Sequence, residues 1–329
     1  METEGAHSAR ERECSSGIVA PVSRTPPPTS TPDFLRTLHR KRAVSDDGTR
    51  ISYEVLGEGE RVLLLANGLG GRLYAWEPLL EGLWRDYRLI TWDYRGLFDS
   101  DTPTSRRRLS LVDHVHDACA ILQAERCQRA TFVGWSMGVQ VALDLAATHP
   151  ELCAGLVLMN GTYGHTLATG FQPLVSVPGV PKLLHFLIES IHGHPAVADR
   201  VAQLARLGEL PTTAMFALTA GRRGIALRPA LRRYMDDVLG PSFDNYLRLF
   251  QELDAHSVYH LLPEIQSPAL VVSGLLDALT PARQSWEIHW RLRDSKHLAL
   301  LRASHFSLLE HPELVVPAVR TFLETRARW

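Results

Sequence analysis

The chain has 329 residues, of which 45% are hydrophobic and 22% are charged, close to ordinary globular usage. This composition excludes a collagen-like, coiled-coil or largely disordered protein and leaves room for one large α/β unit or two modest domains. Its 35 basic and 36 acidic residues give a formal net charge of -1, so no global field favours nucleic acid or an anionic membrane. Charge alone therefore favours a small-molecule substrate without formal charge.

The first 32 residues mix Glu, Arg, Ser and Thr with a run of three prolines and show neither helical nor strand periodicity. Such a segment cannot bury enough apolar surface to offset its ordering entropy, so residues 1–32 are predicted to be a disordered tail. It lacks the apolar core of a signal peptide, and no run in the chain reaches the ~18 apolar residues of a membrane span. The four cysteines form no CxxC pair. We therefore expect a cytoplasmic protein with reduced thiols and no membrane-spanning segment.

Eight strands are predicted in chain order. Residues 42–44 and 51–55 flank the turn Asp46-Asp47-Gly48 and predict an antiparallel hairpin. Later strands are short and almost continuously apolar, as expected of strands buried on both faces. They span residues 62–66, 88–92, 130–133, 155–159, 269–272 and 298–301.

Helical periodicity follows most of these strands, at residues 111–127, 137–149, 283–292 and 312–326. Alternating strands and helices predict an α/β fold with a mostly parallel eight-stranded sheet and helices on both faces. The interval 162–263 has no buried strand, only helical patches at 183–191, 195–207 and 229–239. Because a hundred residues is too long for a loop, we predict a helical cap at 162–263 inserted into a core of residues 33–161 and 264–329. The cap should roof the site with apolar residues, which could line the pocket but more often form a cap's own small core. They are Phe171, Leu174, Phe186, Met215, Phe216 and Phe250.

The candidate nucleophile is Ser136, in the sequence Gly134-Trp135-Ser136-Met137-Gly138 between a predicted strand and a predicted helix. This is the context that a G-x-S-x-G nucleophile elbow requires. Its glycines allow a tight, strained turn that presents the hydroxyl at the carboxyl end of the sheet, beside a helix N-terminus.

A serine nucleophile needs a base, and the base needs a carboxylate to orient it. Asp277 follows the predicted strand 269–272, and His305 follows the predicted strand 298–301. The order Ser136, Asp277, His305 is the one expected of this architecture. His311 lies within the predicted final helix and is not favoured as the base. No pattern of ligands suggests a metal, and no cofactor is expected.

These motifs together resemble the α/β-hydrolase family, in its serine-nucleophile branch of esterases, perhydrolase-type haloperoxidases, lactonases and carbon-carbon bond hydrolases. The resemblance covers residues 42–326 outside the cap. It implies an oxyanion hole made by the backbone amides of Met137 and Leu69, the latter in Asn67-Gly68-Leu69-Gly70-Gly71. Asn67 stands where the family usually has histidine, and Phe98 where it commonly has a second glycine. The tentative substrate contacts are Trp135, Asn67, Phe98 and Phe306.

The expected activity is hydrolysis of an uncharged, largely apolar carboxylic ester or lactone through an acyl-enzyme. Serine at the elbow argues against epoxide hydrolases and haloalkane dehalogenases, which place aspartate there in this family. A carbon-carbon bond hydrolase or a perhydrolase remains open, as does a non-catalytic small-molecule receptor that retains the fold. Sequence leaves the oligomeric state open.

Overall fold

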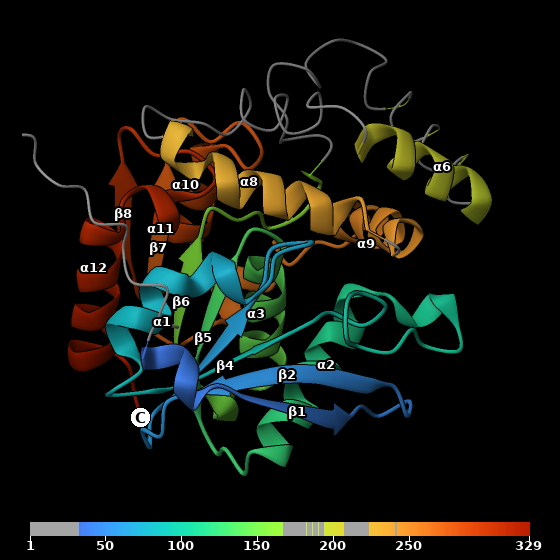
Figure 1. The fold of residues 1–329 in the computed structure, drawn as a ribbon. Coiled ribbons are helices and arrows are strands. Elements are labelled where there is room, and N and C mark those ends of the chain that lie inside the picture. The colour runs from blue at the N-terminus through green and yellow to red at the C-terminus, as the bar shows by residue number, and fades with distance from the viewer. Residues whose placement is uncertain are drawn as a thin grey trace, which may run out of the picture. The chain divides into compact units, whose positions relative to one another are not determined.

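A computed structural model describes residues 33–166, 182, 186, 190, 194–206, 224–240 and 242–329. The predicted tail, residues 1–32, lies outside this part. Eight strands form one sheet in the order β1-β2-β4-β3-β5-β6-β7-β8, which confirms the predicted α/β-hydrolase architecture (Figure 1). The strands are β1 (His39–Val44), β2 (Arg50–Leu56), β3 (Val62–Ala66), β4 (Arg88–Trp92), β5 (Ala130–Trp135), β6 (Cys153–Met159), β7 (Ala269–Gly274) and β8 (Ser295–Leu300).

Burial accounts for the strand directions and for the early start of β8; β1, β2 and β6 also begin one to three residues before their predicted starts. β1 and β2 are antiparallel to their neighbours, whereas β3 to β8 run parallel. Every residue of β3, β5, β6 and β7 is buried, as their continuous apolar sequences predict. β8 begins at Ser295, three residues before its predicted start, because an edge strand tolerates the polar run Ser295-Lys296-His297.

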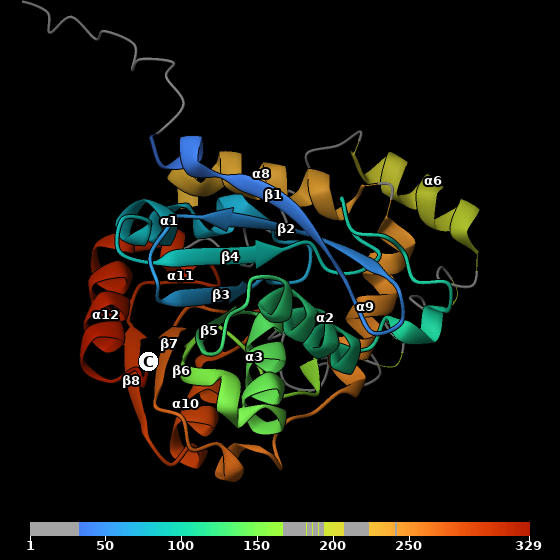
Figure 2. The same ribbon diagram turned by 90° about the horizontal axis from the view of Figure 1, so that it is seen from below.

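Helices cover both faces of the sheet (Figure 2). One apolar cluster joins one face to α2, α3 and α10, and a second joins the other face to α1 and α12. α2 begins with a capping box in which Ser110 and Asp113 satisfy each other's backbone amides. The helices flanking the sheet are α1 (Glu77–Leu83), α2 (Leu111–Ala124), α3 (Met137–Thr148), α10 (Ala282–Arg291), α11 (Ser307–Glu310) and α12 (Pro312–Thr325).

Between β6 and β7 the described residues form α6 (Pro195–Arg206), α8 (Gly224–Val238) and α9 (Phe243–Ala255). α6 and α8 overlap two of the three predicted helical patches, while most of the patch at 183–191 lies outside the described residues. α8 and α9 lie across the carboxyl ends of the strands (Figure 1). The cap boundaries at 162 and 263 stay a prediction. Within the described ranges, no helix is both long and apolar enough to cross a membrane.

The strand order of the sheet reverses at one point, and a ligand-binding site is expected there. β3 lies between β4 and β5, so the chain leaves β3 toward one side and returns on the other. Ligands of open α/β sheets bind outside the carboxyl ends of the strands at such a switch point. The loop after β3 and the turn after β5 therefore meet at one place.

Candidate active site

Ser136 occupies a strained turn between β5 and α3. Its φ of 56° and ψ of −118° are rare for a residue with a side chain. Both flanking glycines are required by space: a Cβ on Gly134 would lie 2.4 Å from the Gly138 carbonyl oxygen, and one on Gly138 would lie 1.9 Å from the Ala66 carbonyl oxygen. The turn therefore packs against the end of β3 and leaves the Ser136 side chain facing a cavity.

Asp277 is a fully buried carboxylate with hydrogen-bond donors on both oxygens. Oδ1 accepts from the backbone amides of Leu279 and Thr280, each at 2.9 Å. Oδ2 lies 2.9 Å from His305 Nδ1, 2.8 Å from Thr280 Oγ1 and 3.0 Å from the donating Asn160 Nδ2. Buried charge is tolerated when it is paired and hydrogen-bonded in this way. The arrangement keeps the carboxylate directed at the imidazole.

His305 is held through its backbone as well as its ring. The Trp135 indole donates to the His305 carbonyl oxygen at 2.9 Å, which ties the histidine loop to the nucleophile strand. The preceding residue, Ser304, is bound by Glu310 through both its amide and its hydroxyl. When Nδ1–H donates to Asp277, Nε2 is left as a proton acceptor. Among the described residues no hydrogen bond joins Nε2 to the Ser136 hydroxyl, a looseness common in unliganded sites.

The loop after β3 places the amide of Leu69 beside the elbow. Its turn closes with a hydrogen bond from the Gly71 amide to the Gly68 carbonyl oxygen at 2.8 Å, and Gly70 has a φ of +79°. The Leu69 carbonyl oxygen accepts from the Tyr234 hydroxyl of α8 at 2.7 Å. In the described part of the chain, the amides of Leu69 and Met137 have no acceptor. Amides at a helix N-terminus and in a glycine loop are donors of the kind that can bind an anion.

Ser136 and His305 line one cavity of about 70 Å³. Thr162, Thr166 and Thr280 also line it, and apart from these threonines, Ser136 and His305, the described lining residues are aliphatic or aromatic. Burial raises the pKa of Tyr246 to about 12 and the pKa of Tyr234 well above its usual range, so both phenols stay neutral. The other lining residues are Leu69, Tyr234, Tyr246, Phe250, Leu253 and Leu279.

None of the four tentative substrate contacts lines this cavity. Asn67 turns inward, because its side chain donates to the Trp92 carbonyl oxygen at 2.6 Å and accepts from the Trp76 indole. Phe98, with a φ of 53°, packs beneath the Arg72 guanidinium at 4.5 Å and lines a separate depression. Neither residue is among the described residues that line the cavity of Ser136 and His305, so their contact with substrate stays a prediction.

Trp135 and Phe306 also act from behind the cavity wall. Their rings pack against each other with centroids 5.2 Å apart, and each also contacts the His305 ring. Trp135 is thereby a support for His305 and for the turn at Gly68, whose Cβ would lie 2.7 Å from the indole. Of the predicted cap residues, Phe250 lines the cavity and Phe186 is 64% exposed. Phe171, Leu174, Met215 and Phe216 lie outside the described residues.

Sequence reasoning missed the polar residues that hold the site from behind. Asn160, at the end of β6 with a φ of 47°, donates to both Asp277 and the Ser304 carbonyl oxygen at 3.0 Å and accepts from Ser307. Its one available signal was its place directly after a buried strand. Tyr234 carried no local signal, since its partner Leu69 comes from another element, whereas Thr280 lies only three residues after Asp277, which it bonds.

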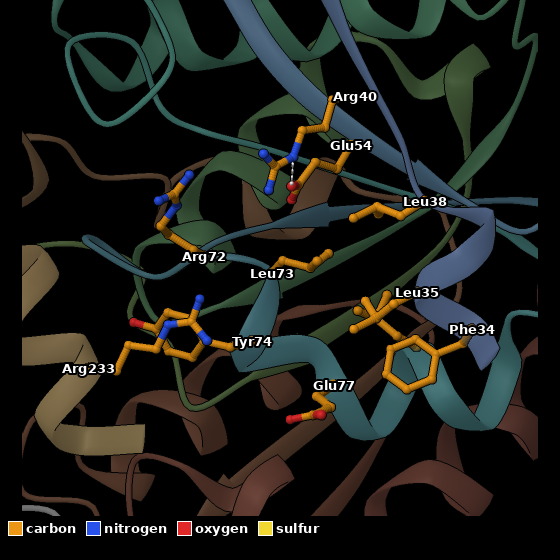
Figure 3. Close-up of a pocket in the computed structure, with 11 residues that line it drawn as sticks. Phe34, Leu35, Leu38, Arg40, Glu54, Arg72, Leu73, Tyr74, Glu77 and Arg233 are labelled. Carbon is orange, nitrogen blue, oxygen red and sulfur yellow. Dashed lines mark hydrogen bonds and ion pairs between the residues drawn. The ribbon is translucent and has the colours of Figure 1, made fainter. Parts of the chain in front are cut away.

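A larger pocket of about 300 Å³ lies apart from the triad (Figure 3). Arg233 reaches from α8 over the Tyr74 ring on one side, while Phe34 and Leu38 lie on the other. Arg40 and Glu54 form an ion pair at 3.1 Å on its rim. Its lining, within the described residues, holds no serine, cysteine or histidine, so this pocket offers no nucleophile and base pair. Nor do the described ranges contain a cluster of side chains able to hold a metal ion.

Comparison with known proteins places this arrangement in a family. Residues 61–312 match the family model described as alpha/beta hydrolase fold. Epoxide hydrolase 4 of Homo sapiens is 23% identical over 93% of this chain and 84% of its own length. The solved enol-lactonase from Burkholderia xenovorans LB400 superposes with a TM-score of 0.67, with 25% identity over 86% of this chain and all of its own. The esterase RhEst1 from Rhodococcus sp. ECU1013 gives a TM-score of 0.66, with 27% identity over 88% and 99%.

Proposed function

This chain belongs to the alpha/beta hydrolase family and is a hydrolase, and from that premise we propose that it cleaves uncharged, largely apolar carboxylic esters or lactones through a covalent serine intermediate. The observation that carries the proposal is the shared cavity. Ser136, in a strained turn, and His305, whose ring bonds the buried Asp277, line the same space, and so does Leu69, whose amide the proposal assigns to the oxyanion hole together with that of Met137. The combination is a nucleophile, a base and donors for an oxyanion.

In the proposed mechanism His305 Nε2 removes the Ser136 proton as Oγ attacks the substrate carbonyl carbon. The amides of Leu69 and Met137 stabilise the oxyanion, and each such donor contributes about 3–4 kcal/mol in the transition state. The imidazolium, held by Asp277, returns its proton to the departing alcohol oxygen. A water molecule, deprotonated by the same nitrogen, then attacks the acyl carbon; the carboxylic acid leaves and Ser136 recovers its proton.

The cavity wall supports an uncharged substrate. Apart from His305, none of the described lining residues carries an ionisable charge at neutral pH, because both tyrosines are held neutral by burial. Burying a charged group there would cost several kcal/mol without compensation. The enol-lactonase and the esterase are named for reactions of this kind, which supports the choice of ester or lactone. The epoxide hydrolase relative is only 23% identical. This chain has serine at the elbow, where the family resemblance implies aspartate in epoxide hydrolases.

The test is hydrolysis of p-nitrophenyl esters from acetyl to decanoyl by the wild-type protein and by Ser136→Ala. We expect turnover by the wild type and at least a thousandfold lower kcat for the variant. Fluorophosphonate labelling of the wild type, lost in Ser136→Ala, is the matching covalent readout.

Equal ester hydrolysis by both proteins would refute Ser136 as the nucleophile. Turnover of a vinylogous diketone but of no ester would instead indicate a carbon-carbon bond hydrolase. Tight small-molecule binding with neither labelling nor turnover would indicate a receptor that keeps the fold.

A further inference from the structure

Tyr246 of α9 lies between two cavities. It lines the cavity of Ser136 and His305, called here the Ser136 cavity, and it also lines the separate depression of about 140 Å³ beside Phe98, called here the Phe98 depression. Among the described lining residues, Tyr246 is the only one that the two cavities share. The loop after β3 also borders both, because Leu69 lines the Ser136 cavity and the next residue, Gly70, lines the depression.

Neighbouring residues place two ends of the Tyr246 side chain. A Cβ on Gly70 would lie 3.1 Å from Tyr246 Cε2 and 3.6 Å from Cδ2, so one ring edge lies against the loop. Burial raises the pKa of Tyr246 to about 12, and a hydrogen bond with the Tyr234 hydroxyl acts in the opposite direction, so the two hydroxyls are neighbours. The Tyr234 hydroxyl donates to the Leu69 carbonyl oxygen, and both residues line the Ser136 cavity. The ring therefore extends from the depression to the Ser136 cavity.

Packing holds the Tyr246 ring in this position. It stacks on Phe243 of the same helix, with ring centroids 6.3 Å apart and planes inclined by 14°. It also packs against the apolar clusters of both sheet faces and against a third cluster between α6 and α9. Because close-packed side chains yield little, a ring held on several sides acts as a wall between the cavities.

The wall of the Phe98 depression is mostly hydrocarbon or glycine. Asp237 is the one carboxylate among its described lining residues, and the guanidinium groups of Arg72 and Arg233 are among the charged neighbours of that carboxylate. Such a wall suits an uncharged hydrocarbon chain, since each buried methylene favours binding about fourfold. Besides Asp237 and Tyr246, the described lining consists of Gly70, Leu97, Phe98, Val238, Gly240 and Ser242.

We propose that Tyr246 is a specificity-determining residue: its ring limits the length of the substrate's hydrocarbon chain, and the Phe98 depression behind it becomes a subsite for a longer chain when the ring is removed. The inference rests on the proposed ester or lactone hydrolysis and narrows its substrate class to esters whose hydrocarbon chain ends at this ring. The chain can belong to the acyl half or to the alcohol half of the ester.

The experiment measures kcat/KM for a long and a short ester in two arms. The acyl arm compares p-nitrophenyl octanoate with p-nitrophenyl acetate, and the alcohol arm compares hexyl acetate with ethyl acetate by titration at constant pH. The proteins are the wild type, Tyr246→Ala, Tyr246→Val, Tyr246→Phe and Phe250→Ala. Phe250 is the matched control, because it is an aromatic residue of the same helix that lines the Ser136 cavity but not the depression.

We expect Tyr246→Ala and Tyr246→Val to raise the long-to-short ratio of kcat/KM in at least one arm by about 16- to 64-fold, which corresponds to two or three further buried methylenes. Tyr246→Phe should keep the wild-type ratio, because the ring remains. Phe250→Ala should raise the ratio less than Tyr246→Ala does, because it enlarges one cavity without opening the other. The arm that responds identifies the half of the ester that carries the chain.

A second substitution tests where the longer chain goes. Phe98→Gly removes a side chain from the wall of the depression, and glycine suits the φ of 53° at this position. Its effect on the long-to-short ratio should be several-fold larger in the Tyr246→Ala background than with the ring in place, because the chain reaches Phe98 only after the ring is gone. Equal effects in the two backgrounds would overturn the assignment of the depression as the subsite.

Unchanged ratios in both arms for Tyr246→Ala and Tyr246→Val would overturn the inference, while Ser136-dependent hydrolysis of the short esters would still support the proposed function. A rise of the same size in Tyr246→Phe or Phe250→Ala would also overturn it. Absence of all ester turnover together with absence of fluorophosphonate labelling in the wild type would overturn both. Comparing two small replacements of Tyr246, each with its urea unfolding midpoint, ensures that poor folding of one variant does not decide the result.

Discussion

Asn160 is the residue whose removal tests the support of the triad most directly. It is buried at the end of β6, and its side chain makes three hydrogen bonds: to Asp277 Oδ2 at 3.0 Å, to the Ser304 carbonyl oxygen at 3.0 Å, and from the Ser307 hydroxyl. Asn160→Ala removes all three at once. It also places alanine at a φ of 47°, a conformation that asparagine tolerates better than alanine.

The expected loss of stability follows from these contacts. A hydrogen bond to a charged group contributes about 1.5–3 kcal/mol, and each of the two neutral bonds contributes about 0.5–1.5 kcal/mol. The left-handed backbone adds about 1 kcal/mol. We therefore expect Asn160→Ala to lower the free energy of unfolding by about 3.5–7 kcal/mol. Asn160→Gly is the matched variant, because it removes the same amide without backbone strain and should be about 1 kcal/mol less destabilised.

The assay is urea unfolding, read as a shift of the midpoint at constant m-value, with steady-state ester kinetics at a temperature where both variants remain folded. Asp277 without its Asn160 donor should orient His305 less well, so kcat should fall about tenfold while KM changes little. A destabilisation below about 1 kcal/mol together with an unchanged kcat would refute this reasoning. A lower stability with an unchanged kcat would show that Asn160 serves the fold alone.

Three further outcomes are expected. Thr131→Val should raise the free energy of unfolding by about 1–2 kcal/mol, because it replaces a buried hydroxyl without a partner by a methyl group of similar shape; a urea midpoint at or below that of the wild type would contradict this. Burial lowers the pKa of His297 to about 4, so the unfolded chain protonates this imidazole near pH 6.5 and the folded chain only near pH 4. The wild type therefore loses stability as the pH falls between these values, and His297→Gln should lose less. Parallel pH-stability curves for the two proteins would contradict the lowered pKa of His297. Tyr234→Phe frees the Leu69 carbonyl oxygen and should lower kcat several-fold more than it changes KM, whereas an effect on KM alone would mean that the hydroxyl contacts substrate instead.

The sheet and the candidate triad were predictable because their signals are local. Continuous apolar runs identify buried strands, and Ser136, Asp277 and His305 each stand shortly after one. Parallel strands bring their carboxyl ends to one edge, so a residue's place after its strand already predicts which other residues it meets. The Gly134 and Gly138 pair adds a steric requirement that sequence also reveals.

The supporting polar contacts were not predictable, because they join residues distant in the chain. Asn160 and Asp277 are 117 positions apart, and Tyr234 and Leu69 are 165 apart. For Asn67 the same limit made sequence position misleading about where the side chain lies. Its position in the loop after β3 suggested contact with substrate, but its bonds to Trp76 and the Trp92 carbonyl oxygen turn the side chain into the core. Side-chain direction in an irregular loop depends on such distant partners.

The glycine loop after β3 shows why the helices between β6 and β7 cannot be treated as an addition to a finished active site. A Cβ on Gly68 would lie 2.7 Å from the Trp135 ring, and one on Gly70 would lie 2.7 Å from Val238 of α8. The loop is therefore confined between the nucleophile strand on one side and α8 on the other, while Tyr234 of the same helix bonds the Leu69 carbonyl oxygen. Because an amide donor stabilises an oxyanion only when it is held in place, α8 contributes to the proposed chemistry as well as to the cavity wall. Loosening α8 should thus lower kcat for small esters that never touch it.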